Sequence, residues 1–440
     1  MFTVPGQSAL FCDGVSRRSF LKAGFLGGVG LSLTDVLRLR SLGAESSPNR
    51  PNTAVIFVEL AGGPTQFETY DPKPDAPAEF RGALGVVQTS IPGEVFSELM
   101  PEQARIADQL VIIRSIHHSS NSHDPSSHLS QTGYYKSTAK GAPNQMPCFG
   151  SVVAKLRGAS FPSLPAYVAI PNVMRNGRSA YLGPAWNPFE TTTDPNRKDF
   201  DIPNLKPSAK VTLDRLEDRR TLLSAFDAQR RFNDLQGDAD AIDEFSQRAF
   251  ELVHGSRARE AFDISREDPK LRDRYGRNTV GQSLLLARRL VEAGVTCVTV
   301  RCTGWDDHNS LVKRLKQRAP DYDRGIASLI KDLQDRGLHN DVLVVAMGEF
   351  GRTPRVNRNA GRDHWGAVMS VLLAGGGLKT GVVGASNSKG EVPIRSAYRP
   401  ENVLAMIYRH LNIDPQLTFD DSNGRPRYLL EERNPIQEIA

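Results

Sequence analysis

The amino-acid sequence predicts an α/β protein built on a largely parallel sheet that is flanked by helices. Apolar, β-branched runs of strand length recur along the chain, and amphipathic stretches of helix length separate them. The strand-like runs cover residues 53–60, 110–116, 295–301 and 342–347, and the clearest helical stretches cover 284–293 and 321–337. Alternation of this kind builds right-handed crossovers and therefore parallel strands.

The N-terminal segment is not expected to join this sheet. Arg17 and Arg18 precede a Gly-, Ala- and Leu-rich run from Ala23 to Leu33, which is the pattern of a Tat export signal with cleavage near Ala44. An ordinary first helix is the alternative. The predicted parts of the chain are the Tat signal (1–44), a linker (45–52) and a single domain (53–440) with a helical insertion at about 207–280.

Charge and cysteine content exclude several classes of protein. The chain carries 55 Lys and Arg against 50 Asp and Glu, and removal of the predicted signal leaves 50 against 48, a net charge of +2. Such a balance does not fit nucleic-acid binding. Cys148, Cys297 and Cys302 lack C-x-x-C spacing, so we expect buried thiols rather than a zinc–cysteine site. No later run reaches the ~18 apolar residues of a membrane span.

The strand-like run Val342–Met347 ends in a turn rich in functional side chains. Glu349 and Arg352 follow it directly, at the carboxyl end where α/β sheets build their sites. Asp363 and His364 come shortly afterwards, in a charged segment without the periodicity of a core element. We predict a site here; a solvated loop with a structural Glu–Arg pair is the alternative.

Two more strand ends carry imidazoles and carboxylates. The run 110–116 leads into a segment with four histidines within twelve residues, where Asp124 and Pro125 predict a helix start and the helix continues to about Thr132. The run 295–301 ends at Asp306 and His308. Enrichment of histidine by chance, or for solubility, is the alternative for the first segment.

Carboxylates and imidazoles without thiolates are typical ligands of Zn, Mn or Fe, so we predict one or two divalent ions. The predicted ligands are His118, His128, Asp306, His308, Glu349, Asp363 and His364, and the predicted catalytic residues are His123 and Arg352.

The chain resembles the Tat-exported bacterial family known as domain of unknown function 1501, a branch of the alkaline phosphatase/sulfatase-like superfamily. The resemblance covers essentially the whole chain after the signal and implies an alkaline phosphatase/sulfatase-like fold. The segments that carry it are GGPTQFETYDPKP (62–74), the His-rich segment with Thr132-Gly133, LLLARRLVEAG (284–294), GWDDH (304–308), GEFGRTP (348–354) and GRDHW (361–365).

Departures from true sulfatases bear on the chemistry. In the frame where a sulfatase has C/S-x-P-S-R, this chain reads His123-Asp124-Pro125-Ser126-Ser127, so His123 takes the nucleophile's place and formylglycine is excluded. Gly62-Gly63 replaces the paired metal-binding aspartates at the first strand end. His123 is therefore expected to hold metal, attack the substrate or donate a proton, with the first role favoured.

Two functions follow from these observations. The first is an exported, metal-dependent hydrolase of small or polymeric phosphate or sulfate esters. The alternative is a non-catalytic relative that binds an anionic glycan or a cell-surface partner. Both predict transport by the Tat machinery to the periplasm, cell envelope or exterior, without nucleic-acid partners and without a membrane span in the mature chain.

Overall fold

The computed structural model describes residues 53–136, 143–202 and 256–440. The predicted signal, the linker and residues 207–255 of the predicted insertion lie outside this part of the chain. The end of that insertion falls within it and contains two short helices, α9 (Ser256–Phe262) and α10 (Pro269–Tyr275). In the described residues, no helix is both long and apolar enough to cross a membrane.

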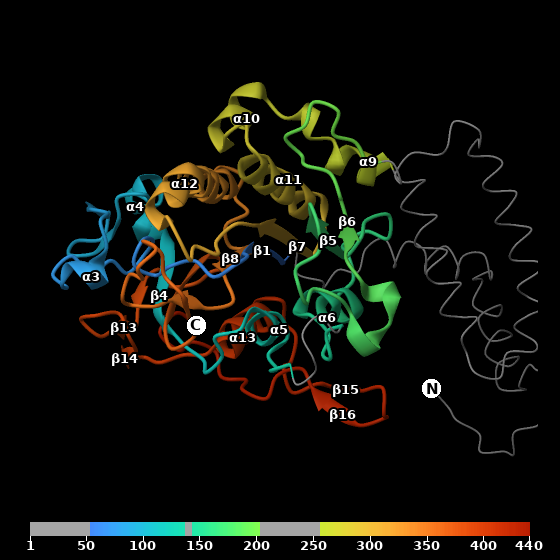
Figure 1. Ribbon diagram of the computed structural model, residues 1–440. Helices are drawn as coiled ribbons and strands as arrows, with labels where there is room; N and C mark the ends of the chain where they lie inside the picture. Colours follow the sequence, from blue (N-terminus) through green and yellow to red (C-terminus); the bar gives the residue numbers. More distant parts are fainter. Residues whose placement is uncertain (1–52, 137–142, 203–255) are drawn as a thin grey trace, which may run out of the picture. The chain divides into compact units, whose positions relative to one another are not determined.

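An eight-stranded sheet forms the centre of the molecule (Figure 1). Seven strands run in one direction, and β11 alone runs antiparallel to its neighbours β4 and β8. The largely parallel sheet is thus confirmed, with one reversed strand that the sequence did not predict. In spatial order the strands are β12 (Gly381–Val383), β4 (Leu110–Ile116), β11 (Met369–Gly375), β8 (Val342–Met347), β1 (Ala54–Leu60), β7 (Cys297–Cys302), β5 (Tyr167–Ile170) and β6 (Phe189–Glu190).

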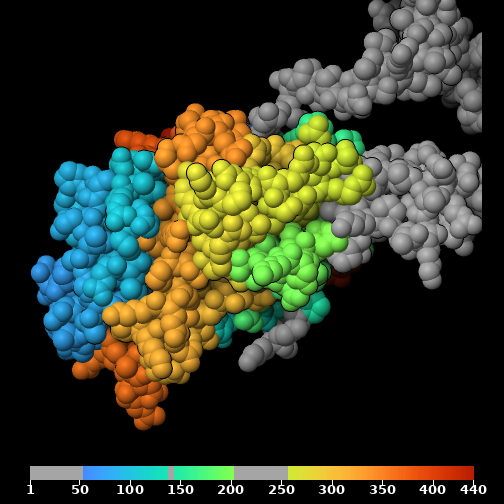
Figure 2. All heavy atoms as spheres, turned by 90° about the horizontal axis from the view of Figure 1, so that it is seen from above, coloured from blue at the N-terminus to red at the C-terminus, as the bar shows by residue number. Residues whose placement is uncertain are grey.

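Helices cover both faces of the sheet, so the central strands are mostly apolar. Ala54, Ile56 and Val58 of β1 pack into one core cluster with α11 (Thr279–Ala293) and α12 (Leu311–Asp335). Figure 2 shows this helical layer from above. Val55 and Phe57 point to the opposite face, which is covered by α6 (Phe149–Leu156) and α13 (Pro400–His410). The three described cysteines are buried and unpaired, as predicted.

Several predicted boundaries shift in the structure. Helix α5 (His123–Thr132) begins at His123, ahead of the predicted start, because Asp124 pairs with Lys136 instead of capping the helix. Helix α12 begins ten residues before the predicted Asp321 and carries Pro320 inside it. Residues 160–206, which are rich in proline and asparagine and show no clear periodicity, contain the buried strand β5.

Smaller elements complete the chain. They are α3 (Ala78–Arg81), α4 (Pro101–Arg105), the short 3₁₀ helices at Ala107–Gln109, Ala180–Leu182, Pro184–Trp186 and Ile264–Arg266, and the paired strands β2 (Val86–Gln88) with β3 (Val95–Ser97), β9 (Gly351–Arg352) with β10 (His364–Trp365), β13 (Ala385–Ser386) with β14 (Pro393–Arg395), and β15 (Thr418–Asp420) with β16 (Pro426–Tyr428).

Candidate metal centre

The three clusters predicted from the sequence meet at one edge of the sheet. Strands β1, β4, β7 and β8 are mutually parallel, so their carboxyl ends lie at the same edge. The segment after β4 delivers His123, the turn after β7 delivers Asp306, and the loop after β8 delivers Glu349 and His364. Convergence of distant segments therefore follows from strand direction.

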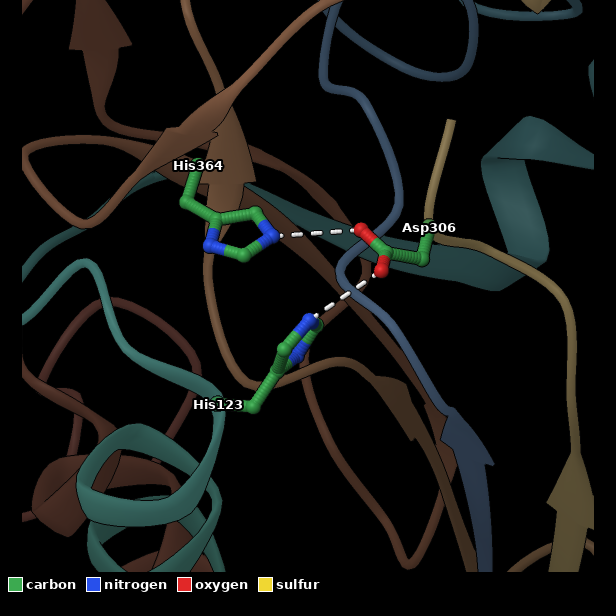
Figure 3. A group of neighbouring side chains, drawn as sticks. All are labelled: His123, Asp306 and His364. Carbon is green, nitrogen blue, oxygen red and sulfur yellow. Dashed lines mark hydrogen bonds and ion pairs between the residues drawn. The ribbon is translucent and has the colours of Figure 1, made fainter. Parts of the chain in front are cut away.

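Imidazole nitrogens surround the Asp306 carboxylate (Figure 3). His123 Nε2 lies 3.2 Å from one carboxylate oxygen, and His364 Nε2 lies 3.1 Å from the other. One ligand atom from each of these three residues lies within 4.8 Å of the other two. His308 extends the group, because its Nε2 is 3.0 Å from Asp306 Oδ1 and 2.9 Å from His364 Nε2.

Each of the three rings is held through its other nitrogen. Nδ1 of His123 lies 2.7 Å from the Glu349 carboxylate, and Nδ1 of His308 lies 2.7 Å from the Asp363 carboxylate. Nδ1 of His364 lies 2.9 Å from the backbone carbonyl of Asn121. These partners offer acceptor oxygens, to which each ring donates in the tautomer that carries its proton on Nδ1. In that tautomer all three Nε2 lone pairs face Asp306 and are free to bind a cation.

This arrangement concentrates negative potential. Burial alone would raise the pKa of the Asp306 carboxyl, but the hydrogen bond and charge of Arg352 outweigh it and hold that pKa well below its usual range. Burial lowers the pKa of His364, which favours its neutral form. Two Nε2 lone pairs 2.9 Å apart beside a carboxylate repel one another unless a proton or a cation lies between them.

The donor set fits a divalent transition-metal ion. Donors about 2.1 Å from a tetrahedral ion lie about 3.4 Å apart. The distances from Asp306 Oδ1 to Nε2 of His308 and of His364, 3.0 and 3.1 Å, are only a few tenths of an ångström shorter. Imidazole and carboxylate suit Zn, Mn or Fe. The side chains of His308 and Asp306 are 40% and 42% exposed, so the centre is open to solvent. The described residues contain no second group of this kind.

Glu349 and Asp363 were predicted to be ligands, and the structure places them behind the rings. Glu349 Oε1 and Oε2 accept from the backbone N–H of Gly62 at 3.1 and 3.0 Å, while Oε1 also faces His123. Asp363 meets Nδ1 of His308, whose Nε2 points into the centre. A carboxylate that fixes the tautomer and orientation of a metal-binding histidine is a common supporting feature of metal sites.

Arg352 was predicted to be catalytic, but its side chain is buried and committed to protein partners. It donates to the carbonyls of Gly63 and Trp305 at 2.8 and 3.1 Å and to the Asp306 carboxylate at 2.6 Å. Further bonds reach the carbonyls of Gly62 and Arg362. This geometry makes Arg352 a positioning residue for Asp306.

His118 and His128 were predicted to be ligands, and neither joins the group. Nε2 of His118 bonds to the backbone carbonyl of Glu349 at 2.7 Å, and burial lowers the pKa of His118 to about 4. Nδ1 of His128 donates to the Tyr134 carbonyl, while its Nε2 accepts backbone N–H groups of Gln145 and Met146. Both nitrogens of His128 are therefore used.

Close backbone approach explains the paired glycines after β1. Gly62 has a φ of 119°, and a Cβ at this position would lie 2.6 Å from the backbone nitrogen of Asp306. Gly63 packs equally closely on the ring of Phe350. Packed neighbours therefore account for the Gly-Gly pair.

Sequence reasoning missed two asparagines that support the centre. Asn121 orients His364 through its carbonyl and accepts the Gly366 N–H at 2.6 Å through its side chain. Asn357 Nδ2 donates to the His308 carbonyl at 3.0 Å. The sequence carries no signal for these roles, since asparagine is common in loops.

Comparisons with known proteins place this chain in context. The sequence model of a family described as "Protein of unknown function (DUF1501)" matches residues 52–440. No curated protein matches the chain.

Three solved structures share a partial likeness with it. A sulfatase from Pseudoalteromonas sp. is 12% identical, with a TM-score of 0.39 over 87% of this chain and 71% of that one. The lipoteichoic acid synthase LtaP from Listeria monocytogenes is 10% identical, with a TM-score of 0.36 over 89% and 76%. An alkaline phosphatase from the Antarctic bacterium TAB5 is 11% identical, with a TM-score of 0.36 over 83% and 99%. Likenesses at this level say nothing about the chemistry of this chain.

Proposed function

The chain belongs to the DUF1501 family, and from that premise we propose that it is an exported, metal-dependent hydrolase of phosphate or sulfate esters. One observation carries the proposal: three imidazoles, each fixed at Nδ1, direct their Nε2 atoms at the Asp306 carboxylate in a solvent-accessible place. His123, Asp306 and His364 hold the ion, and His308 is the candidate for a fourth ligand.

The residues of the chain have separable roles. A bound divalent ion would act as a Lewis acid toward an ester oxygen and stabilise the charge that develops there. Glu349 and Asp363 keep the Nδ1 protons in place, so that the rings of His123 and His308 cannot rotate away. Arg352 holds Asp306 in its ionised form. None of these roles requires formylglycine, which an imidazole at position 123 cannot form.

A non-catalytic function is favoured by one specific observation. If His308 Nε2 binds together with His123, Asp306 and His364, a tetrahedral ion has four protein ligands and no open position, which is typical of structural sites. Such a protein would use its fold to bind an anionic glycan or a partner. The number of protein ligands therefore separates the two functions.

Metal analysis and ester hydrolysis test the proposal together. The folded full chain should hold about one Zn, Mn or Fe ion per molecule and hydrolyse p-nitrophenyl phosphate or p-nitrophenyl sulfate. A chelator should remove both the ion and the activity. A folded protein that carries no metal and takes up none would contradict the proposal, and a metal-loaded protein inactive on both esters would favour the non-catalytic function.

His123 offers the sharpest variant, and His128 on the same helix is its control. His123→Ala should lose metal and activity together, while His128→Gln should keep both because that ring bonds to backbone groups and to the Thr132 hydroxyl, away from the metal centre. His123→Asp should retain part of both, since a carboxylate can also bind the ion. If His123→Ala keeps its metal and loses turnover, His123 is a nucleophile or an acid rather than a ligand.

Export is a separate part of the proposal and has its own test. Arg17 and Arg18 form the twin-arginine pattern, so replacing both with lysine should hold the precursor in the cytoplasm. Cell fractionation measures this directly. Arrival of the unchanged chain at the envelope in a Tat-deficient strain would show that another route exports it.

A further inference from the structure

Helix α12 begins with a concentration of positive charge beside the metal centre. Lys313, Arg314 and Lys316 are all exposed in its first turns, and the first turn contains no acidic residue. Leu311 and Leu315 form the buried side of the same turns. Cations at a helix N-terminus oppose the helix dipole and reduce stability. Packing therefore gives no reason for this charge pattern.

A second basic segment joins the start of α12. The loop after β9 carries Arg355 and Arg358, both exposed. This loop is bonded to the helix start, because the carbonyls of Asn359 and Ala360 accept the N–H groups of Ser310 and Leu311 at 3.0 and 2.9 Å. Asn357, next to Arg358, donates to the carbonyl of His308. We call these five cations the basic rim: Lys313, Arg314, Lys316, Arg355 and Arg358.

No cation of the basic rim forms an ion pair within the described residues. Other surface arginines do: Arg105 pairs with Glu102 at 2.7 Å, and Arg277 pairs with Asp273 at 2.6 Å. Nearby acids are already engaged, since Asp307 pairs with Arg318 and Asp363 pairs with His308. The backbone carbonyl of Glu79 accepts a hydrogen bond from the N–H of Val356, in the loop that carries Arg355 and Arg358. The positive charge of the rim thus stays available to a ligand.

We propose that the basic rim binds a polysaccharide carrying repeated sulfate or phosphate ester groups and presents one of these groups to the metal centre. This inference rests on the proposed function and names its substrate class. A small monoester reaches one site, whereas a polymer contacts several cations at once and gains affinity from each. The rim segments 311–316 and 355–360 contain no aromatic residue on which bases could stack, which disfavours single-stranded nucleic acid.

Binding of two probe polymers to the full chain tests the proposal. Heparin supplies sulfate groups and polyphosphate supplies phosphate groups, so the two arms separate the two chemistries. The rim variant combines Lys313→Gln, Arg314→Gln and Lys316→Gln. Because it removes exposed charges on one face, it should bind whichever polymer the unchanged protein prefers roughly tenfold more weakly or worse. Its metal content and thermal stability should not change.

A control variant removes the same charge from scattered exposed lysines without ion-pair partners. It combines Lys198→Gln, Lys270→Gln and Lys379→Gln, and it should bind as the unchanged protein does. Equal weakening in both variants, or no weakening in the rim variant, would overturn the inference.

Removal of the metal distinguishes this inference from the proposed function. Polymer binding should survive chelation, because the rim cations do not ligate the ion. If the protein never holds metal but the rim still selects the polymer, hydrolysis is excluded and the polymer is a ligand only. If the metal-loaded enzyme cleaves p-nitrophenyl esters while the rim variant binds polymer normally, the proposed hydrolase function is supported. The inference that the basic rim binds a polymeric substrate is then contradicted.

Discussion

Two clusters of ionisable side chains in this molecule differ in how their charges are balanced. Around Arg288, between α11 and α12, a fully buried guanidinium meets Glu267 and Asp332 at 2.8 Å each and Glu292 at 2.6 Å. Around Asp306, one carboxylate meets three imidazoles whose Nε2 atoms point toward it. The first cluster pairs a cation with anions, whereas the second gathers a carboxylate and three imidazoles, all of which can bind a cation.

This difference separates a structural cluster from a functional one. In the Arg288 cluster every side chain has a partner of opposite sign within the protein, so nothing further is needed to satisfy it. In the Asp306 cluster one cation, Arg352, reaches the carboxylate, and the Nε2 atoms of His308 and His364 face one another at 2.9 Å, an arrangement that needs a proton or a cation between them. An arrangement that is incomplete without a cation is expected where the cation has a function.

Asp306 and its neighbour Asp307 give the largest expected contrast. Asp306→Ala should remove essentially all of the bound metal, because it deletes the carboxylate that all three rings face. Asp307→Ala should leave the metal in place, since Asp307 pairs with Arg318 and is not among the grouped ligand atoms. Elemental analysis of both folded variants measures the contrast. Equal metal content in the two variants would show that Asp306 is not a metal ligand.

Arg288→Met should show the opposite behaviour. It leaves Glu267 and Asp332 without their buried partner, which should lower the free energy of unfolding by about 3–5 kcal/mol. Metal content should not change. Urea denaturation measures the effect, and Arg105→Met, which breaks an exposed pair, should cost less than about 1 kcal/mol. A loss of metal on breaking the Arg288 cluster would show that the two clusters are coupled.

His118 makes the supporting layer of the centre sensitive to acid. Burial lowers its folded-state pKa from 6.5 to about 4, so the unfolded chain binds a proton more readily between these values. The contribution of neutral His118 to the free energy of unfolding, on the order of 3 kcal/mol, is complete above pH 6.5 and is lost as the pH falls toward 4.

His118→Gln should flatten this dependence, because glutamine can still donate to the Glu349 carbonyl and does not titrate. Unfolding of the metal-free protein at several pH values is the measurement. Burial also lowers the pKa of His128 and of His410, so a weaker acid sensitivity should remain. An unchanged pH profile in the variant would contradict the role given to His118.

Glu349→Gln should have the smallest effect of the four. If Glu349 orients His123 without binding the ion, its loss should weaken metal affinity by about 10–100-fold. Competition with a metal-binding dye measures this. Complete loss of metal, as expected for Asp306→Ala, would instead make Glu349 a ligand, as the sequence suggested.

Sequence patterns predicted four of the eight strands of the sheet, β1, β4, β7 and β8. Val342–Met347 was predicted with its observed bounds because a buried strand is apolar on both faces. Strand β5 was missed because four apolar residues among prolines and asparagines are too short to show a period. The reversed direction of β11 has no local signature, since both orientations bury the same side chains.

At the candidate site, the sequence identified the residue types and their convergence, but not their individual roles. Periodicity and strand ends show which segments meet, whereas the partner of each ring nitrogen depends on contacts between residues hundreds of positions apart. Glu349 and Gly62, for example, are separated by 287 residues. His128 looks as suitable a ligand as His123 in the sequence, and only the backbone around it shows otherwise.

The position of β1 at the centre of the sheet constrains how the chain matures. Ribosomes make this strand long before its neighbours β7 and β8, and Gly62 meets Glu349 only 287 residues later. At about 5–20 residues per second that interval lasts about 15–60 s. For most of this time the apolar strand lacks its partners, so the nascent chain needs protection from aggregation, and the metal centre cannot assemble before His364 has been made.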